Sequence, residues 1–243
     1  MPNVTLGPFP AARRFTGLDA RVAEPITHNP AERRSWISRS IALLMVLAIA
    51  VILLVPNSLF ADTTKTLTAN TVFYPQGSGT AVQFKAGTVV TLNPQNQVIS
   101  GTLAQNTVLY PQGSGTAVQF IAGGPVNFNI HGQVTSGVLA QNTVLYPQGS
   151  GTAVQFKGGQ VVNFNIHGNV IYAFLAQNTV LYPQGSGTAV QFMAGSGITF
   201  NEHGQVISGY LAQNTALYPQ SGGGAVQFKA GTKVTFNEKG LAR

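Results

Sequence analysis

Short runs of alternating apolar and polar residues, separated by clusters rich in Gly and Asn, fill the chain beyond residue 65. Between Thr102 and Gly137, the triplets VQF at 118–120 and VNF at 126–128 each place two apolar side chains on one face of an extended strand. No stretch of this segment has the apolar spacing of a helix. The pattern therefore predicts short β-strands joined by turns.

Three breaks divide that segment into about three to four short strands. The sequence PQGSG at 111–115 predicts a turn, because Pro fixes one backbone dihedral and Gly accepts positive ones. The sequence NIHG at 129–132 predicts a hairpin loop whose Gly is left-handed. The third break is AGG at 122–124.

The whole pattern repeats every 36 residues without insertion or deletion. The marker residues are Tyr74, Tyr110, Tyr146, Tyr182 and Tyr218, each followed by Pro and Gln, and Asn70, Asn106, Asn142, Asn178 and Asn214. The repeat domain, 66–243, therefore divides into the units 66–101, 102–137, 138–173, 174–209 and 210–243.

The fold class predicted is an all-β tandem array of five 36-residue β-hairpin units. A lone hairpin is marginal in water, so each unit must be covered by its neighbours in a nearest-neighbour stack. An elongated meander or a β-solenoid fits best, and a five-bladed β-propeller is the alternative. Because the units are nearly identical, a shift by one unit restores most side-chain pairings, which makes strand exchange between molecules an open alternative.

The last unit is more charged than the others. It contains Lys229, Lys233, Glu238, Lys239 and Arg243, whereas the second unit contains no charged residue. This contrast predicts that the fifth unit is a polar cap that blocks further strand pairing.

The amino-terminal part has a different organisation. Residues 1–40 predict a disordered, Arg-bearing cytoplasmic tail, and 41–60, built on the apolar run IALLMVLAIAVILLV, predict a single transmembrane or signal-anchor helix followed by a linker at 61–65. Six Arg lie in residues 1–40, on the amino-terminal side of this run. The positive-inside rule then places that side in the cytoplasm and the repeats outside it. The alternatives are a signal peptide cleaved near Ala61, or twin-arginine export through Arg33 and Arg34.

Composition and charge argue against several classes of function. The net charge is +7, but charged residues are only 8% of the chain and form no basic stripe, so no nucleic-acid partner is expected. The chain has no Cys, and only Asp62, Glu202 and Glu238 are acidic beyond residue 60. We therefore predict no catalytic residues, no cofactor and no metal site, and the protein is not expected to be an enzyme.

A recurrent His at the hairpin turn could suggest a metal or pH-sensing ladder. His131, His167 and His203 share this position, but the other units place Gln95 and Lys239 there. A position that accepts His, Gln and Lys is typical of a solvated turn, and this is the interpretation we favour.

The segment 198–211, ITFNEHGQVISGYL, resembles the MORN-type hairpin repeats of bacterial envelope proteins. This resemblance implies an antiparallel sheet and a scaffolding role. Together with the predicted anchor, it favours a non-catalytic membrane-anchored envelope protein, acting as a scaffold, spacer or adhesion surface. Its partners would be the membrane through 41–60 and an envelope protein, a glycan or a second copy.

Two alternative functions remain open. The first is a multivalent glycan-binding module, with the five Tyr named above as stacking rings and Asn106, Asn142, Asn178 and Asn214 as candidate hydroxyl-binding amides. The second is a secreted, self-assembling β fibre, because few charges and high strand propensity suit cross-β assembly.

Overall fold

The computed structural model of the chain describes residues 61–147 and 151–243. This part consists of strands and turns, without a helix, and among these residues no helix is long and apolar enough to cross a membrane. The predicted tail at 1–40 and the predicted apolar helix at 41–60 lie outside the described residues. The anchor and its orientation therefore stay predictions.

Residues 61–147 and 151–243 form twenty strands: β1, four in each of the first four units, and three in the fifth. The first strands of the units are β2 (Thr71–Phe73), β6 (Thr107–Leu109), β10 (Thr143–Leu145), β14 (Thr179–Leu181) and β18 (Thr215–Leu217). The second strands are β3 (Val82–Phe84), β7 (Val118–Phe120), β11 (Val154–Phe156), β15 (Val190–Phe192) and β19 (Val226–Phe228). The third strands are β4 (Val89–Leu92), β8 (Pro125–Phe128), β12 (Val161–Phe164), β16 (Gly197–Phe200) and β20 (Lys233–Thr235). The fourth strands are β5 (Val98–Thr102), β9 (Val134–Val138), β13 (Val170–Phe174) and β17 (Val206–Tyr210), and β1 (Thr63–Thr66) precedes them all.

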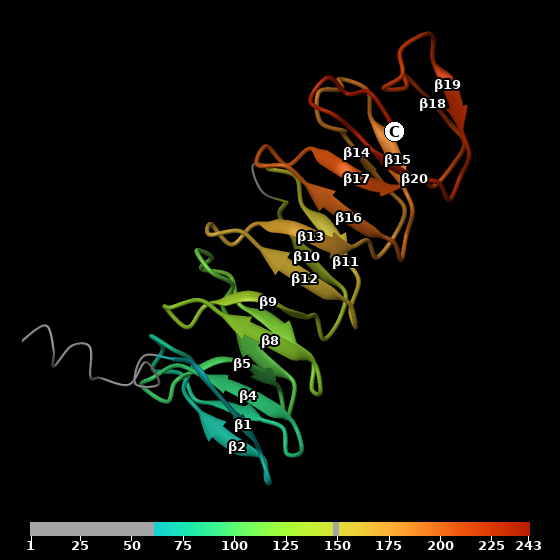
Figure 1. Cartoon of the computed structure of the whole chain (residues 1–243). Coiled ribbons are helices and arrows are strands. Elements are labelled where there is room, and N and C mark those ends of the chain that lie inside the picture. The colour runs from blue at the N-terminus through green and yellow to red at the C-terminus, as the bar shows by residue number, and fades with distance from the viewer. Residues whose placement is uncertain (1–60, 148–150) are drawn as a thin grey trace, which may run out of the picture. The chain divides into compact units, whose positions relative to one another are not determined.

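One antiparallel sheet of ten strands passes through every unit (Figure 1). Its order is β1-β4-β5-β8-β9-β12-β13-β16-β17-β20, so each of the first four units adds two neighbouring strands and the fifth adds β20. The first two strands of each unit instead form a separate two-stranded hairpin. This topology confirms the all-β meander, and it differs from the five-bladed alternative, because a propeller would have a separate sheet in each blade.

The hairpin loop between the third and fourth strands follows the prediction. Gly132 has φ of 70°, and in the first unit Asn96 takes the same position with φ of 59°. The Asn129 side-chain oxygen accepts hydrogen bonds from the backbone N–H groups of His131 and Gln133, at 2.9 and 3.0 Å. Next to this turn, the register of β8 and β9 shifts between Asn127 and Phe128, where β9 carries one extra residue as a β-bulge.

The core lies between the long sheet and the small hairpins. Val118 and Phe120 of β7 are almost completely buried, as their alternation with Gln119 predicts. The Phe120 ring meets Phe164 of the next unit edge-on, with centroids 6.5 Å apart. The same contact recurs in the pairs Phe84–Phe128, Phe156–Phe200 and Phe192–Phe236. Each of the first four hairpins therefore covers its own unit and the following one.

The fifth unit, which its charges predict to be a polar cap, also differs from the inner units in its hairpin. The fifth unit carries the extra charges, but its hairpin β18–β19 leaves Val226 47% exposed and Phe228 only partly buried. The equivalent Val118 and Phe120 are 2% and 0% exposed. In the inner hairpins these side chains are covered by the unit that follows, as Phe120 is by Phe164.

Candidate functional site

A row of exposed side chains runs along the small hairpins, one group in each unit. The five candidate tyrosines, Tyr74, Tyr110, Tyr146, Tyr182 and Tyr218, are 53–61% exposed. In β6, Val108 points to solvent like Tyr110, two residues later, whereas Leu109 between them is buried. Val72, Val144 and Val180 repeat this exposure in their own units. We call these tyrosines and valines the Tyr/Val row.

The candidate asparagines occupy the other end of the same strand. The Asn106 side-chain oxygen accepts a hydrogen bond from the Ala122 N–H at 2.8 Å, which ties the start of β6 to the turn after β7. Asn70, Asn142, Asn178 and Asn214 make the equivalent bond. Asn106 and Tyr110 lie four residues apart, or roughly 13 Å along an extended strand. The structure therefore does not bring the predicted Tyr and Asn of one unit into a single pocket.

Tyr110 instead lines a shallow groove between the first two units. The cavity volume is about 280 Å³, and its polar lining includes Ser78, Ser114, His131 and Gln133. Pockets for small molecules usually measure about 300–1,000 Å³. The groove volume lies at the lower end of this range.

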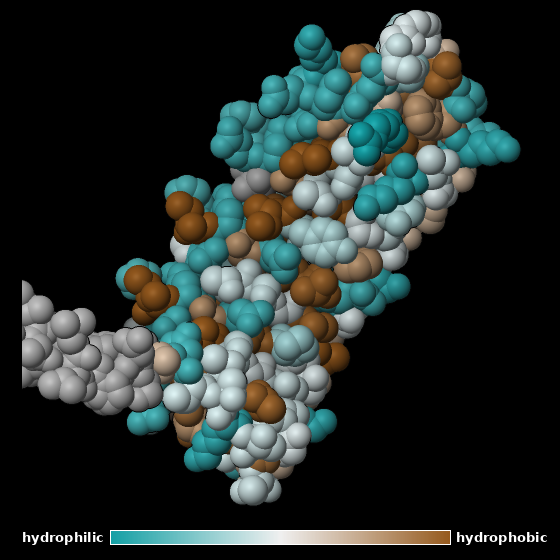
Figure 2. Space-filling model, in the orientation of Figure 1, coloured by the Kyte–Doolittle hydropathy of each residue, from teal (hydrophilic) through white to brown (hydrophobic). Residues whose placement is uncertain are grey.

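On the face shown in Figure 2, apolar side chains recur from unit to unit among weakly polar ones. Scattered single apolar residues are normal on a protein surface, whereas a regularly repeated set is a candidate contact surface.

In the first, second and fourth units, the glutamine that follows the Tyr-Pro pair connects two units. Gln112 is only 8% exposed. Its side-chain oxygen accepts a hydrogen bond from the Asn129 amide of its own unit at 3.3 Å, and its amide nitrogen donates to the Phe164 carbonyl of the next unit at 2.9 Å. The amides of Gln76 and Gln184 donate in the same way to the carbonyls of Phe128 and Phe236.

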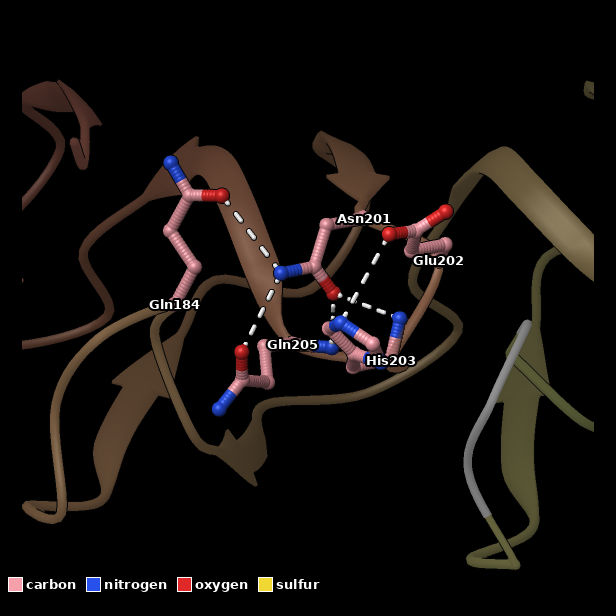
Figure 3. A network of polar contacts seen from close by, with 5 residues as sticks. All are labelled: Gln184, Asn201, Glu202, His203 and Gln205. Atoms are coloured by element: carbon pink, nitrogen blue, oxygen red, sulfur yellow. Dashed lines mark hydrogen bonds and ion pairs between the residues drawn. The ribbon is translucent and has the colours of Figure 1, made fainter. Parts of the chain in front are cut away.

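Figure 3 shows the same network around Asn201. The Asn201 amide nitrogen donates to the side-chain oxygens of Gln184 and Gln205, at 3.5 and 3.1 Å. Its oxygen accepts from the backbone N–H groups of His203 and Gln205. Sequence reasoning missed this bridging role of the glutamine. Its recurrence after every Tyr-Pro pair was the available signal.

The loop that contains this glutamine also packs tightly on the next unit. Gly113 has φ of 68°, and a Cβ added to it would lie 2.6 Å from the His167 Cα. A Cβ on Gly168, in the same turn as His167, would lie 2.6 Å from the Gln112 carbonyl oxygen. Only glycine fits at either position, so the loop of one unit and the hairpin turn of the next fit directly against each other.

The recurrent histidines sit at the turn tips and are exposed, as predicted. The closest charged partner is that of His203, whose Nε2 lies 3.6 Å from an oxygen of Glu202. Both side chains are more than 70% exposed, so this contact contributes little to stability. Within residues 61–147 and 151–243, no three His or acidic residues are grouped so as to hold a metal ion.

The chain was also compared with known proteins. No protein-family model matches it, and a search of curated proteins finds no match. The functional argument therefore rests on the residues and on their arrangement.

Proposed function

We propose that this chain is a non-catalytic repeat scaffold, anchored in a bacterial membrane by residues 41–60, whose β-array presents an adhesion surface outside the cytoplasm. The observation that carries the proposal is the Tyr/Val row, whose tyrosines are all more than half exposed at a 36-residue period. Large apolar side chains that are exposed at the same position in every unit contribute little to the core. Their exposure is better explained by contact with a partner.

The architecture supports the proposal by fixing the spacing of the row. Each of the first four units adds two strands to the sheet, and neighbouring strands lie about 4.8 Å apart, so equivalent tyrosines recur every ~10 Å. The glutamine bridges and the loop–turn contacts hold adjacent units in this relation. Several weak contacts at regular spacing can act together on an extended partner.

Adhesion can be tested on cells that display the full-length chain, using polystyrene as the probe surface. Replacing Tyr110, Tyr146 and Tyr182 by Ser should reduce attachment several-fold while leaving the unfolding midpoint nearly unchanged, because these rings are largely exposed. The matched control replaces the exposed Gln105, Gln141 and Gln177 by Ser. Equal attachment by both variants would contradict the proposed adhesion surface.

The proposed location has its own test, which the absence of Cys makes simple. Thr116→Cys, in an exposed loop, should react with a membrane-impermeant maleimide in cells whose inner membrane is intact. Ser38→Cys, in the predicted cytoplasmic tail, should react only after lysis. Protection of the thiol at position 116 until lysis would place the repeats on the wrong side of the membrane.

A second candidate, multivalent glycan binding, is favoured by the groove beside Tyr110, which combines an aromatic ring with polar side chains. On a glycan array, this function requires that Tyr→Ala changes at several equivalent positions reduce the signal, whereas Tyr→Phe changes preserve stacking. The scaffold proposal instead expects the array to show no glycan whose binding depends on these rings.

A further inference from the structure

Strands β13, β16 and β17 are consecutive in the long sheet (Figure 1), and one of its faces is turned away from the core. In β16, Ile198 is completely buried, so Gly197 and Thr199 on either side of it lie on the opposite face. We call this opposite face the open face. The residues directly across from Thr199 and Gly197 in β13 are Tyr172 and Phe174, which places two aromatic rings on the open face.

This part of the open face differs from its counterparts in the other units. Tyr172 occupies a position that is serine elsewhere, in Ser100, Ser136 and Ser208. Gly197 occupies a position that has a side chain in every other unit, as Val89, Pro125, Val161 and Lys233. The third and fourth units therefore combine a large ring with a missing side chain on neighbouring strands, in an array whose units are otherwise closely alike.

The combination leaves a shallow hollow beside Gly197. A Cβ on Gly197 would lie 2.7 Å from the Tyr172 hydroxyl oxygen, so a larger residue would displace this ring. The Tyr172 ring packs edge-on against Phe174, with centroids 5.6 Å apart, and Tyr210 of β17 lines the hollow from the other side of β16. The cavity volume is about 240 Å³, and all three rings are only partly buried.

Polar groups complete the lining of the hollow. The hydroxyls of Ser208 and Thr199 lie 3.4 Å apart, and Lys233 is an exposed cation beside them. No acidic residue lines the hollow. Among the described residues, the one ion pair is that of His203 at a turn tip, so the Lys233 ammonium is available to an anion.

We propose that this hollow binds a single sugar ring that carries a carboxylate, such as a hexuronic acid. The faces of aromatic rings are electron-rich and attract the C–H groups of a pyranose. The Thr199 and Ser208 hydroxyls can donate to and accept from sugar hydroxyls, while Lys233 donates to the carboxylate. The volume is below the roughly 300 Å³ at which pockets for larger ligands begin, which suits one ring of a glycan.

This site does not involve the Tyr/Val row, so its test is independent of the proposed adhesion surface. The experiment is a ligand-observed NMR titration of the full-length chain, in a detergent without sugar headgroups, with D-glucuronate and with neutral D-glucose. Glucuronate should bind saturably and several-fold more tightly than glucose. Lys233→Gln should remove this preference, whereas Lys239→Gln, at an exposed turn of the same unit, should keep it.

Two further variants install residues that other units carry at the same positions, so both should fold. Tyr172→Ser removes a stacking ring and Gly197→Val fills the hollow, and each should weaken glucuronate binding by about fivefold or more. Val89→Gly, at the equivalent position of the first unit, is the matched control and should bind like the unchanged chain. The proposal would be overturned by the absence of saturable glucuronate binding, by equal affinity for the two sugars, or by unchanged binding in both variants.

Discussion

Gln112 stabilises two units at once, since it bonds the turn of its own unit and a carbonyl of the next. A buried amide with both partners in place contributes modestly to stability, whereas a partner left unpaired is costly. The fifth unit offers a natural comparison: Gln220 is exposed and bonds only Leu241 of its own unit, at 3.2 Å.

Gln112→Glu should therefore be much more harmful than Gln220→Glu. A carboxylate cannot donate to the Phe164 carbonyl, so we expect the free energy of unfolding to fall by about 1–3 kcal/mol at neutral pH. The exposed Gln220 should tolerate the same change within about 0.5 kcal/mol. Denaturant unfolding of the two variants measures the difference, and equal losses would show that the inter-unit bond is unimportant.

Two glycines of one loop provide a second comparison. Gly113→Ala forces a Cβ into a left-handed backbone and against His167, so a loss of at least about 1–2 kcal/mol is expected. Gly115 has open space around it, and Gly115→Ala should be neutral or slightly stabilising because it restricts the unfolded chain. Thermal unfolding distinguishes them, and similar midpoints for both variants would argue against the tight loop–turn fit.

At the scale of single residues, the sequence predicts local features but not hydrogen-bond partners that are distant along the chain. The alternation around Gln119 and the left-handed Gly132 follow from neighbouring residues, and the structure confirms both. The partner of the Gln112 amide is 52 residues away. Repetition marks this glutamine as important, but it does not reveal which carbonyl the amide meets.

At the scale of elements, the small hairpins are stable only as covers for the long sheet. The Phe120 ring is fully buried between its own unit and Phe164 of the next. Phe228 is the equivalent residue in hairpin β18–β19, where it is only partly buried.

Phe120→Ala should consequently cost about 3–5 kcal/mol, the usual range for a large residue removed from a core. Phe228→Ala removes a ring that is only partly buried, so a loss of no more than about 1–2 kcal/mol is expected. Calorimetry of the two full-length variants provides the measurement. If Phe228→Ala proved as damaging as Phe120→Ala, the difference between inner and terminal hairpins would be refuted.

The order of strands in the sheet was only partly predictable, because it also depends on partners that are distant along the chain. The sequence indicates about four strands in each unit, but a meander and a propeller share that local pattern. The decisive feature is the pairing of β5 with β8, which carries the sheet across the unit boundary. Residues Ser100 and Asn127 of this pair are ordinary strand residues, and neither indicates a pairing between units.

At the scale of the molecule, the repeat array is a series of equivalent nearest-neighbour junctions. Rings, loop–turn contacts and sheet pairing recur at the same period, and no described contact requires a particular number of units. Stability should therefore depend on the number of junctions rather than on any one unit.

Deletion of residues 138–173 from the full-length chain, followed by hydrogen exchange, tests this account most directly. Removal of one full period should leave a folded four-unit array with a lower unfolding midpoint and protected strands in every remaining unit. Deletion of residues 138–155 removes half a period, so the strands on the two sides of the deletion no longer match. The units next to the deletion should then lose protection from exchange. Loss of protection throughout the four-unit chain, as severe as in the half-period variant, would contradict the account of interchangeable units held by their neighbours.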